Sequence, residues 1–157
     1  MRALIVYASW TGTTLKIAKL LADALRQLEI ETAVKQCTEA YPSEFLDVDI
    51  CVVATYTYGA DGDLPEEAED FYYEMEEVDL NGKIFGVLGS GDRKYEKFCP
   101  AVDYFDKQFE TSKAVRGAQP LKINLQPNEQ DVLAINDFAA ELKKSLLSKI
   151  SSINQEG

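Results

Sequence analysis

Strand-like apolar runs alternate with helix-like stripes along almost the whole chain, and this alternation restricts the fold more than any other feature. The strand-like runs cover residues 2–7, 30–36, 49–55, 83–89 and about 121–125. Residues 49–55 and 83–89 are almost continuously apolar, which strands covered on both faces require. Strands separated by helical segments form parallel sheets through right-handed crossovers. The pattern therefore predicts an α/β fold, a three-layer sandwich around a five-stranded parallel sheet.

Three apolar stripes at spacings of three and four residues predict helices that cover this sheet. The stripes are Ile17, Leu21, Ala24, Leu25 and Leu28; Ala68, Phe71, Tyr72 and Met75; and Ile135, Phe138, Ala139, Leu142 and Leu146. Residues 30–36 instead alternate apolar and polar side chains, which favours an exposed strand at an edge of the sheet. Periodicity ends after Lys149. We therefore expect one domain over residues 1–149 and a frayed tail over residues 150–157.

Acidic residues are concentrated in one segment. The net charge is −11, and residues 61–79 contain ten acidic residues and no basic one. Such a field disfavours nucleic acid and steers encounters with basic protein surfaces. The segment predicts a docking face for basic partners, although a solvated helix face would have the same composition. No run approaches the roughly 20 apolar residues of a membrane span, so we expect no membrane insertion.

The chain has no histidine and only three cysteines. The lack of imidazole excludes a Ser-His-Asp triad, a Cys-His pair and a histidine-ligated zinc site. Cys37, Cys51 and Cys99 are scattered and odd in number, so a reducing cytoplasm is the simplest location. Cys51 lies in an apolar run, which predicts an inert core residue. Cys99 ends a glycine-containing loop and is expected near a site.

The turn between the first strand and the first helix combines four hydroxyls with a glycine. Ser9, Thr11, Thr13 and Thr14 surround Gly12 at the expected start of a helix. A helix N-terminus offers free N–H groups and the positive end of the helix dipole, which together bind anions. The turn contains no lysine, so it favours a monoester phosphate over a nucleoside triphosphate with magnesium. The alternative is an ordinary helix cap formed by Thr13 or Thr14.

Two further loops carry glycines and aromatic side chains. Residues 55–65 contain Tyr56 and Tyr58, and residues 89–99 contain Tyr95. In open parallel sheets, ligands bind beyond the carboxyl ends of the strands, where the strand order reverses. A phosphate turn beside two such loops predicts a site for a phosphorylated aromatic cofactor, although each tyrosine taken singly could be a packing residue. The dinucleotide and triphosphate motifs, GxGxxG and GxxxxGK[ST], are both absent.

At these loops the chain resembles the short-chain flavodoxins. The family's phosphate motif, Ser/Thr-x-Thr-Gly-x-Thr, is similar to residues 9–14, and its motif Gly-Ser-Gly-Asp-x-x-Tyr-x-x-Phe-Cys is similar to residues 89–99. Its second flavin loop resembles residues 55–59 leading to Asp63-Leu64-Pro65. The resemblance implies strand order 2-1-3-4-5, non-covalently bound FMN and a low-potential one-electron carrier, with no metal and no catalytic residue. It also implies a reductase-like donor and oxidoreductase acceptors as partners, and we expect a monomer.

The resemblance also implies a role for each loop. Tyr95 would stack on one face of the flavin ring and Tyr58 would cover the other, while the Gly59–Ala60 peptide would face N5 of the semiquinone. The phosphate turn would hold the phosphate, and the backbone around Gly91, Asp92 and Cys99 would bind the pyrimidine edge. The cofactor-binding candidates are Ser9, Trp10, Thr11, Gly12, Thr13, Thr14, Thr55, Tyr56, Thr57, Tyr58, Gly59, Ser90, Gly91, Asp92, Tyr95, Phe98 and Cys99.

Some positions depart from the usual family pattern. Thr13 replaces a common Asn, the second loop carries an extra residue near Ala60, and Arg93 and Lys94 replace small polar residues. An alternative function is an FMN-containing activator dedicated to one enzyme, such as ribonucleotide reductase. A signalling receiver domain has the same sheet order, but it needs clustered acids after the first strand, where this chain has hydroxyls.

Overall fold

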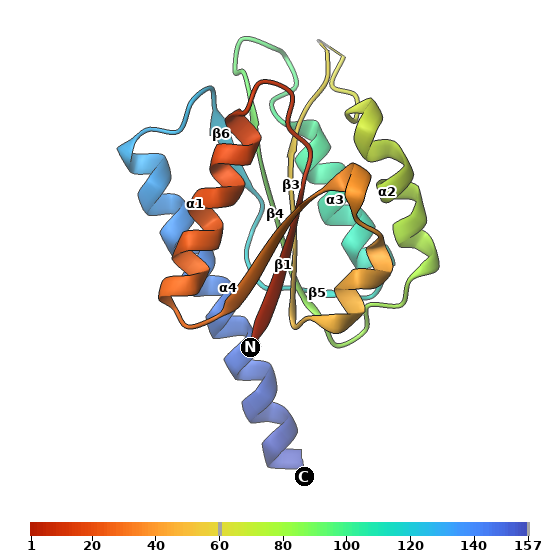
Figure 1. The fold of residues 1–157 in the computed structure, drawn as a ribbon, viewed down its shortest axis with the longest axis vertical. Coiled ribbons are helices and arrows are strands. Elements are labelled where there is room, and N and C mark those ends of the chain that lie inside the picture. The colour runs from red at the N-terminus through yellow and green to blue at the C-terminus, as the bar shows by residue number, and fades with distance from the viewer. Residues whose placement is uncertain (60, 157) are drawn as a thin grey trace.

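The computed structural model describes residues 1–59 and 61–156, and its centre is a parallel β-sheet (Figure 1). The strands are β1 (Arg2–Tyr7), β2 (Glu31–Gln36), β3 (Ile50–Tyr56), β4 (Ile84–Gly91), β5 (Val115–Arg116) and β6 (Leu121–Asn124). Their order is β2-β1-β3-β4-β5, and β6 also pairs with β4. The predicted order is therefore confirmed, and β2 is the edge strand that its alternating sequence indicates.

The fifth strand position is divided between two short segments. The start of β4 pairs with β5 through Ile84 and Val115, whereas the end of β4 pairs with β6 through Leu88 and Leu121. We expected one strand at about residues 121–125, and no pattern predicted β5. A strand of two residues is too short to show any periodicity, so only its pairing with β4 reveals it.

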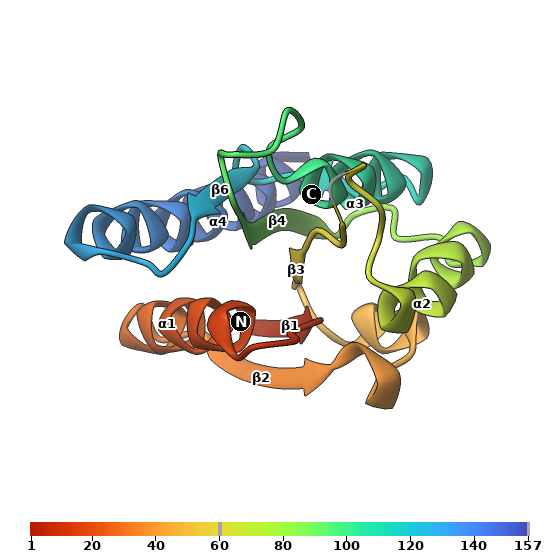
Figure 2. The same cartoon turned by 90° about the horizontal axis from the view of Figure 1, so that it is seen from above.

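Helices cover both faces of the sheet, as Figure 2 shows from above. The helical elements are α1 (Thr13–Gln27), η1 (Cys37–Glu39), η2 (Pro42–Asp47), η3 (Glu66–Ala68), α2 (Glu69–Glu74), η4 (Met75–Glu77), α3 (Pro100–Thr111) and α4 (Glu129–Glu156). Helices α1 and α4 lie on one face, and α2 and α3 lie on the other. The crossover from β2 to β3 contains only the short helices η1 and η2.

Alternating side chains along the central strands build the two halves of the core. In β1, Ala3 and Ile5 belong to the cluster beneath α1 and α4, whereas Leu4 and Val6 belong to the cluster beneath α2 and α3. Successive side chains of a strand point to opposite faces, so a run that is apolar throughout fills both layers. Cys51 in β3 is fully buried in the second cluster, as its apolar run predicts.

Helix α4 extends further than its apolar periodicity indicates. We expected a frayed tail from residue 150, but the helix continues to Glu156. Beyond the buried Leu146, Ile150 and Ile153 follow at helical spacing but are 40% and 56% exposed. Figure 1 shows this end of α4 projecting past the sheet, on the side opposite the loops that follow β1, β3 and β4. None of the helices in the described residues is both long enough and apolar enough to span a membrane.

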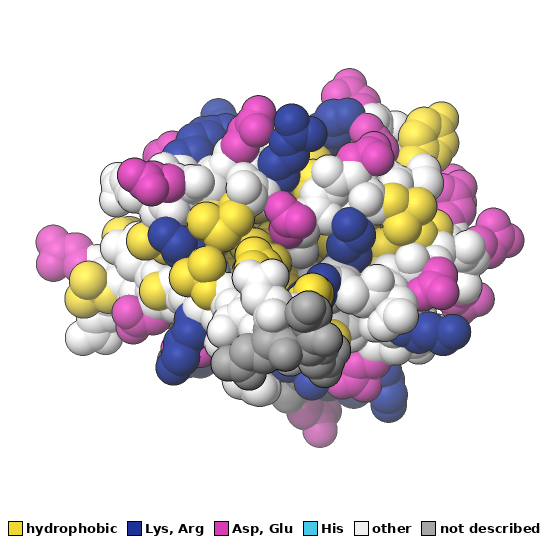
Figure 3. All heavy atoms as spheres, turned by 90° about the horizontal axis from the view of Figure 1, so that it is seen from below, with side chains coloured by type: hydrophobic (Ala, Val, Ile, Leu, Met, Phe, Trp, Pro, Cys, Tyr) yellow, Lys and Arg dark blue, Asp and Glu magenta, His cyan; other side chains and the backbone are white. Residues whose placement is uncertain are grey.

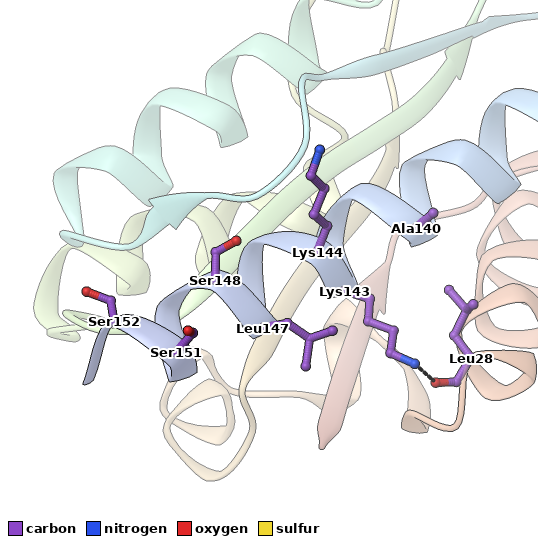
Figure 4. Close-up of a pocket in the computed structure, with 8 residues that line it drawn as sticks. All are labelled: Leu28, Ala140, Lys143, Lys144, Leu147, Ser148, Ser151 and Ser152. Atoms are coloured by element: carbon purple, nitrogen blue, oxygen red, sulfur yellow. Dashed lines mark hydrogen bonds between the residues drawn. The ribbon is translucent and has the colours of Figure 1, made fainter. Parts of the chain in front are cut away.

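A shallow groove lies between the end of α1 and the C-terminal half of α4. Leu28 lies across from Leu147 in this groove, and the Lys143 ammonium donates to the Leu28 carbonyl at 2.8 Å (Figure 4). This bond satisfies a free carbonyl at the end of α1, where a cation is also favoured by the helix dipole. Viewed from below, the same end of the molecule presents apolar side chains among both basic and acidic ones (Figure 3).

Candidate functional site

The loops that follow β1, β3 and β4 meet at one end of the sheet (Figure 1). Strand β1 has β2 on one side and β3 on the other, so the strand order reverses between β1 and β3. Ligands in this class of fold bind at such a reversal, beyond the carboxyl ends of the strands. The structure therefore brings the three predicted loops to the predicted position.

A cavity of about 210 Å³ lies between these loops. The residues that line it come from all three loops and from the end of β6: Thr11, Thr13, Tyr56, Thr57, Ser90, Gly91, Asp92, Tyr95, Lys97, Cys99 and Leu125. Sequence reasoning missed Lys97 and Leu125. Leu125 donates its N–H to the Gly91 carbonyl at 2.8 Å and has φ +59°, so its place depends on a tertiary contact.

The start of α1 is built as an anion site. Gly12 occupies the N-cap position of α1 at φ +95°, a conformation that favours glycine. Because glycine has no side chain, it cannot cap the helix itself. Instead, the Ser9 hydroxyl accepts the N–H groups of Gly12 and Leu15 at 3.2 Å each. Ser9, and not Thr13 or Thr14, therefore supplies the side-chain acceptor at the start of α1. The N–H groups of Thr13 and Thr14, in the first helical turn, have no intrahelical acceptor and remain free for a ligand.

The threonine hydroxyls of the turn have different tasks. Thr14 is 1% exposed, and its hydroxyl bonds to that of Ser90 at 2.9 Å, which ties the first loop to the end of β4. The Thr13 hydroxyl accepts from the Gln126 amide at 2.7 Å. The Thr11 hydroxyl lies 3.5 Å from that of Thr13, at the exposed edge of the cavity. Among the threonines of the turn, Thr11 is thus the hydroxyl best placed to meet an anion.

Two tyrosines supply exposed aromatic surface near the cavity. Tyr95 lines the cavity and is 39% exposed, while Tyr58 is 49% exposed on the neighbouring loop. The Lys94 ammonium lies 5.1 Å from the centre of the Tyr95 ring and 3.6 Å from an Asp92 carboxylate oxygen. The Arg93 guanidinium lies 5.3 Å from the centre of the Phe98 ring. The two basic residues that depart from the family pattern therefore pack over aromatic rings of their own loop.

Some sequence candidates lie outside the cavity lining. The Thr55 side chain is fully buried and donates to the Tyr56 carbonyl at 2.9 Å. Phe98 is half-buried under Arg93, and Tyr58 lines a neighbouring groove. The remaining candidates outside the lining are Ser9, Trp10, Gly12, Thr14 and Gly59. Gly59 has φ +71°, but Ala60 lies outside the described residues, so the orientation of the expected Gly59–Ala60 peptide stays a prediction.

Burial keeps two ionisable groups at the site neutral. Burial raises the pKa of the Cys99 thiol to about 11, so the sulfur is protonated at neutral pH. The Tyr56 hydroxyl donates to a Glu67 carboxylate oxygen at 3.1 Å. Burial, and then the charge of Glu67, raise the pKa of Tyr56. Neither group is a nucleophile here, and both act as packing or hydrogen-bonding residues.

The geometry fits a flat ring that carries one phosphate group. Among the described residues outside the adjoining peptide units, a Cβ added at Gly12 or Gly59 would meet no atom within 4 Å, so open space adjoins the phosphate turn and the second loop. At Gly91 a Cβ would come within 2.6 Å of the Cys99 sulfur, so a side chain there would displace the wall of the cavity. Free helix N–H groups suit a phosphate, and exposed tyrosines suit an aromatic ring.

A second groove, of about 590 Å³, borders the site on the side of α2 and α3. It combines four tyrosines with three carboxylates: Tyr58, Tyr72, Tyr73, Tyr104, Asp63, Glu66 and Glu69, together with Leu64. Of the ten acidic residues between positions 61 and 79, all except the half-buried Glu67 are exposed. We call this groove, defined by these eight residues, the tyrosine–acid groove.

The chain is similar to known proteins over most of its length. A family model described as Flavodoxin matches residues 5–135. The protein called probable flavodoxin 1 of Bacillus subtilis (strain 168) is 39% identical over 139 residues, which cover 88% of this chain and 87% of that protein.

Solved structures agree with this match. A flavodoxin of Streptococcus pneumoniae TIGR4 is 47% identical, with a TM-score of 0.89 over 92% of this chain and 99% of that chain. A short-chain flavodoxin associated with a bacterial microcompartment is 38% identical, with a TM-score of 0.90 over 93% of this chain and 99% of that chain.

Proposed function

The chain belongs to the flavodoxin family, and from this premise we propose that it passes electrons one at a time from a basic reductase to basic acceptor proteins. Flavodoxins are electron carriers that bind FMN and are not enzymes in their own right, and this holds for the present chain. The bound flavin supplies the redox chemistry. The contribution of the protein is to bind the cofactor, tune it and present it to partners.

The donor set of the site suggests how FMN is held. The phosphate would be held at the N-terminus of α1 by the N–H groups of Thr13 and Thr14 and by the Thr11 hydroxyl. Tyr95 and Tyr58, which are partly exposed on separate loops, would cover the ring. The backbone near Gly91 and Cys99 would bind the pyrimidine edge, because the cavity wall has no room for a side chain at Gly91.

Carboxylates beside the site would lower the reduction potential of the cofactor. Asp63, Glu66 and Glu69 line the neighbouring groove that also contains Tyr58, whereas Asp92 is paired with Lys94. One carboxylate about 8 Å from added negative charge, at an effective dielectric near 20, opposes that charge by about 2 kcal/mol before screening. Because a one-electron couple moves by ~59 mV for each tenfold change in its equilibrium constant, several such charges favour a low potential.

The tyrosine–acid groove is the observation that carries the proposal about partners. It contains Tyr58, so a basic side chain bound in the groove would lie beside the proposed ring site. Carboxylates attract a lysine or arginine, and the tyrosine faces add cation–π attraction of about 0.5–2 kcal/mol. A partner anchored there would bring its own redox centre close to the flavin.

Neutralising the groove tests this proposal. We expect the triple variant Asp63→Asn, Glu66→Gln, Glu69→Gln to accept electrons more slowly from an NADPH-dependent flavodoxin reductase at low salt. Its rate should also depend less on ionic strength, because the screened attraction has been removed. Stopped-flow reduction between 20 and 300 mM NaCl measures both effects.

A matched variant separates the groove from total charge. Asp47, Asp137 and Glu141 are exposed acidic residues outside the groove, so their replacement by Asn, Asn and Gln removes the same number of charges. We expect this control to retain most of the rate and of the salt dependence. Equal losses in the two triple variants would contradict docking at the groove and would indicate an effect of net charge alone.

We also propose a reducing compartment, the cytoplasm, and a monomeric state. Cys37, Cys51 and Cys99 are all free and buried, which suits a protein that keeps its thiols reduced. The net charge of −11 opposes association between copies. Light scattering at low and high salt checks the monomer, and a dimer that persists at low salt would contradict it.

A further inference from the structure

We infer that Trp10 is a positioning residue, which holds the Tyr58 ring in place as one wall of the flavin site. The two ring centres are 5.8 Å apart with an angle of 31° between the planes, and the Trp10 ring also lies 6.4 Å from that of Tyr56. The inference rests on the proposed placement of the flavin ring against Tyr58. It explains the role of a cofactor-binding candidate that does not itself line the cavity.

Trp10 reaches Tyr58 from a well-anchored backbone. It lies next to Ser9, whose hydroxyl is held by the N–H groups of Gly12 and Leu15. The loop after β1 lies beside the end of β3, because the Ala8 N–H donates to the Ala54 carbonyl at 2.9 Å. The Trp10 ring is therefore presented from a fixed turn to the neighbouring loop.

Tyr58 also has an anchored backbone but a poorly enclosed ring. Its N–H and carbonyl both bond to Asp63, at 2.9 Å each, so the main chain of the loop is fixed at this point. The side chain nevertheless remains 49% exposed and borders the open tyrosine–acid groove. The Trp10 ring is a large neighbour whose centre lies 5.8 Å from that of Tyr58, and it restricts the directions into which Tyr58 can turn.

The exposure of Trp10 supports this role. Its side chain is 71% exposed, so burial in a core does not explain a tryptophan at this position. Tilted or offset aromatic pairs attract one another beyond the effect of area alone. A Tyr58 ring that Trp10 already holds in place loses less conformational entropy when the cofactor binds, and this favours binding.

Binding of riboflavin and FMN to the apoprotein tests the inference. Riboflavin lacks the phosphate, so it reports on the ring site, whereas FMN reports on ring and phosphate sites together. We expect Trp10→Ala to weaken the binding of both ligands by a similar factor of about two to ten, in the range of aromatic pair energies. Trp10→Phe keeps an aromatic ring and should recover most of the loss. Flavin fluorescence quenching measures these affinities.

A double-mutant cycle with Tyr58→Ala makes the test specific. If Trp10 acts through Tyr58, then Trp10→Ala should cause little further loss of riboflavin affinity in the Tyr58→Ala background. Equal losses in both backgrounds would overturn the inference, and so would a loss that affects FMN but spares riboflavin. An unchanged affinity for both ligands in Trp10→Ala would overturn it as well.

The apoprotein itself gives an independent readout, because Trp10 is the only tryptophan in the chain. Its fluorescence anisotropy should fall in Tyr58→Ala, where the indole loses its neighbour, and an unchanged anisotropy would contradict the contact. The cycle also separates this inference from the proposed function. If Tyr58→Ala leaves riboflavin affinity unchanged, the proposed ring site fails; if only Trp10→Ala has no effect, the positioning role alone fails.

Discussion

In the phosphate turn, some hydroxyl groups form internal hydrogen bonds, whereas others remain accessible to a ligand. Thr14 and Ser90 bond to each other in the interior, so both hydroxyls serve to join two loops. Ser9 serves the turn itself. Thr11 is exposed at the edge of the cavity, so we expect the turn to hold a phosphate through fewer hydroxyls than its sequence contains.

Thr11→Val should weaken FMN binding at least tenfold and leave riboflavin binding unchanged. A hydrogen bond to a charged group contributes about 1.5–3 kcal/mol, and the phosphate is the only part of FMN that riboflavin lacks. Fluorescence titration of the apoprotein measures both affinities. Thr111→Val, at an exposed position on α3, serves as the control, and equal losses for the two ligands in Thr11→Val would contradict the phosphate assignment.

Gly59→Ala should make the first one-electron reduction potential of bound FMN more negative by tens of millivolts, and the second should move less. Gly59 lies at φ +71°, where a residue with a Cβ is strained by about 1–2 kcal/mol, and in the described part of the chain the added methyl group meets no non-adjacent atom within 4 Å. The strain arises in the loop that carries Tyr58, beside the proposed ring site. Redox titration of variant and wild type decides the matter.

Gly82 provides a matched control for this variant. It also has positive φ, at +88°, but it lies in the loop before β4, near Lys149 and away from the site. Gly82→Ala should therefore lower stability without a change in either potential. Identical potentials in Gly59→Ala and wild type would show that the loop conformation at Gly59 does not tune the cofactor.

At the scale of elements, β4 pairs with more strands than any other strand of the described sheet. It pairs with β3 on one side and with β5 and β6 on the other, and its last residues line the cavity. Glycines let its backbone approach neighbouring elements closely. A Cβ at Gly89 would lie 2.1 Å from the Thr55 carbonyl oxygen and 2.6 Å from a methyl group of Val102.

Gly89→Ala should lower the free energy of unfolding of the apoprotein by about 2–3 kcal/mol or more. The obstacle is the backbone of β3, which cannot move aside without breaking its pairing with β4, and overpacking of cores typically costs 1–3 kcal/mol. Urea denaturation measures the loss. Gly12→Ala is the comparison, because its Cβ meets open space and only the strain of φ +95° remains. Equal stability of Gly89→Ala and wild type would contradict the tight approach of β3 and β4.

At the scale of the whole molecule, the charges are distributed asymmetrically. The segment around α2 collects ten acidic residues and no basic one, whereas the groove near the projecting part of α4 is lined by Lys143 and Lys144. Like charges held close together in the native state repel one another, and this repulsion is reduced when the chain unfolds.

Added salt should therefore stabilise the apoprotein. Raising NaCl from 20 to 300 mM shortens the Debye length to less than 10 Å, and we expect the free energy of unfolding to rise by about 1 kcal/mol. Urea denaturation at the two salt concentrations tests this. In the triple variant that lacks the charges of Asp63, Glu66 and Glu69, the increase should be smaller. Stability that does not change with salt would show that self-repulsion is negligible.

Local sequence was sufficient to predict the layered sheet, its edge strand and the three loops that meet around one cavity. An apolar run such as residues 49–55 predicts a buried strand. The hydroxyls and the glycine of residues 9–14 predict an anion site at the start of a helix. These are properties of neighbours along the chain. The end of α4 shows the limit of this reasoning, because helical backbone continues to Glu156 although the apolar stripe has no partner there.

Tertiary structure alone decided which side chains meet across the loops. It directs Thr55 into the core and joins Thr14 to Ser90. It also places Trp10 against Tyr58 and brings Tyr104 of α3 beside Tyr72 of α2 in one groove. Each of these contacts joins segments that are distant in the sequence. Strand register and helix packing set the distance between such segments, and a local sequence pattern does not predict it. The sequence by itself determined the alternation of strands and helices and the loops that gather at one end of the sheet, whereas packing between distant segments decided which residues of those loops face the cavity.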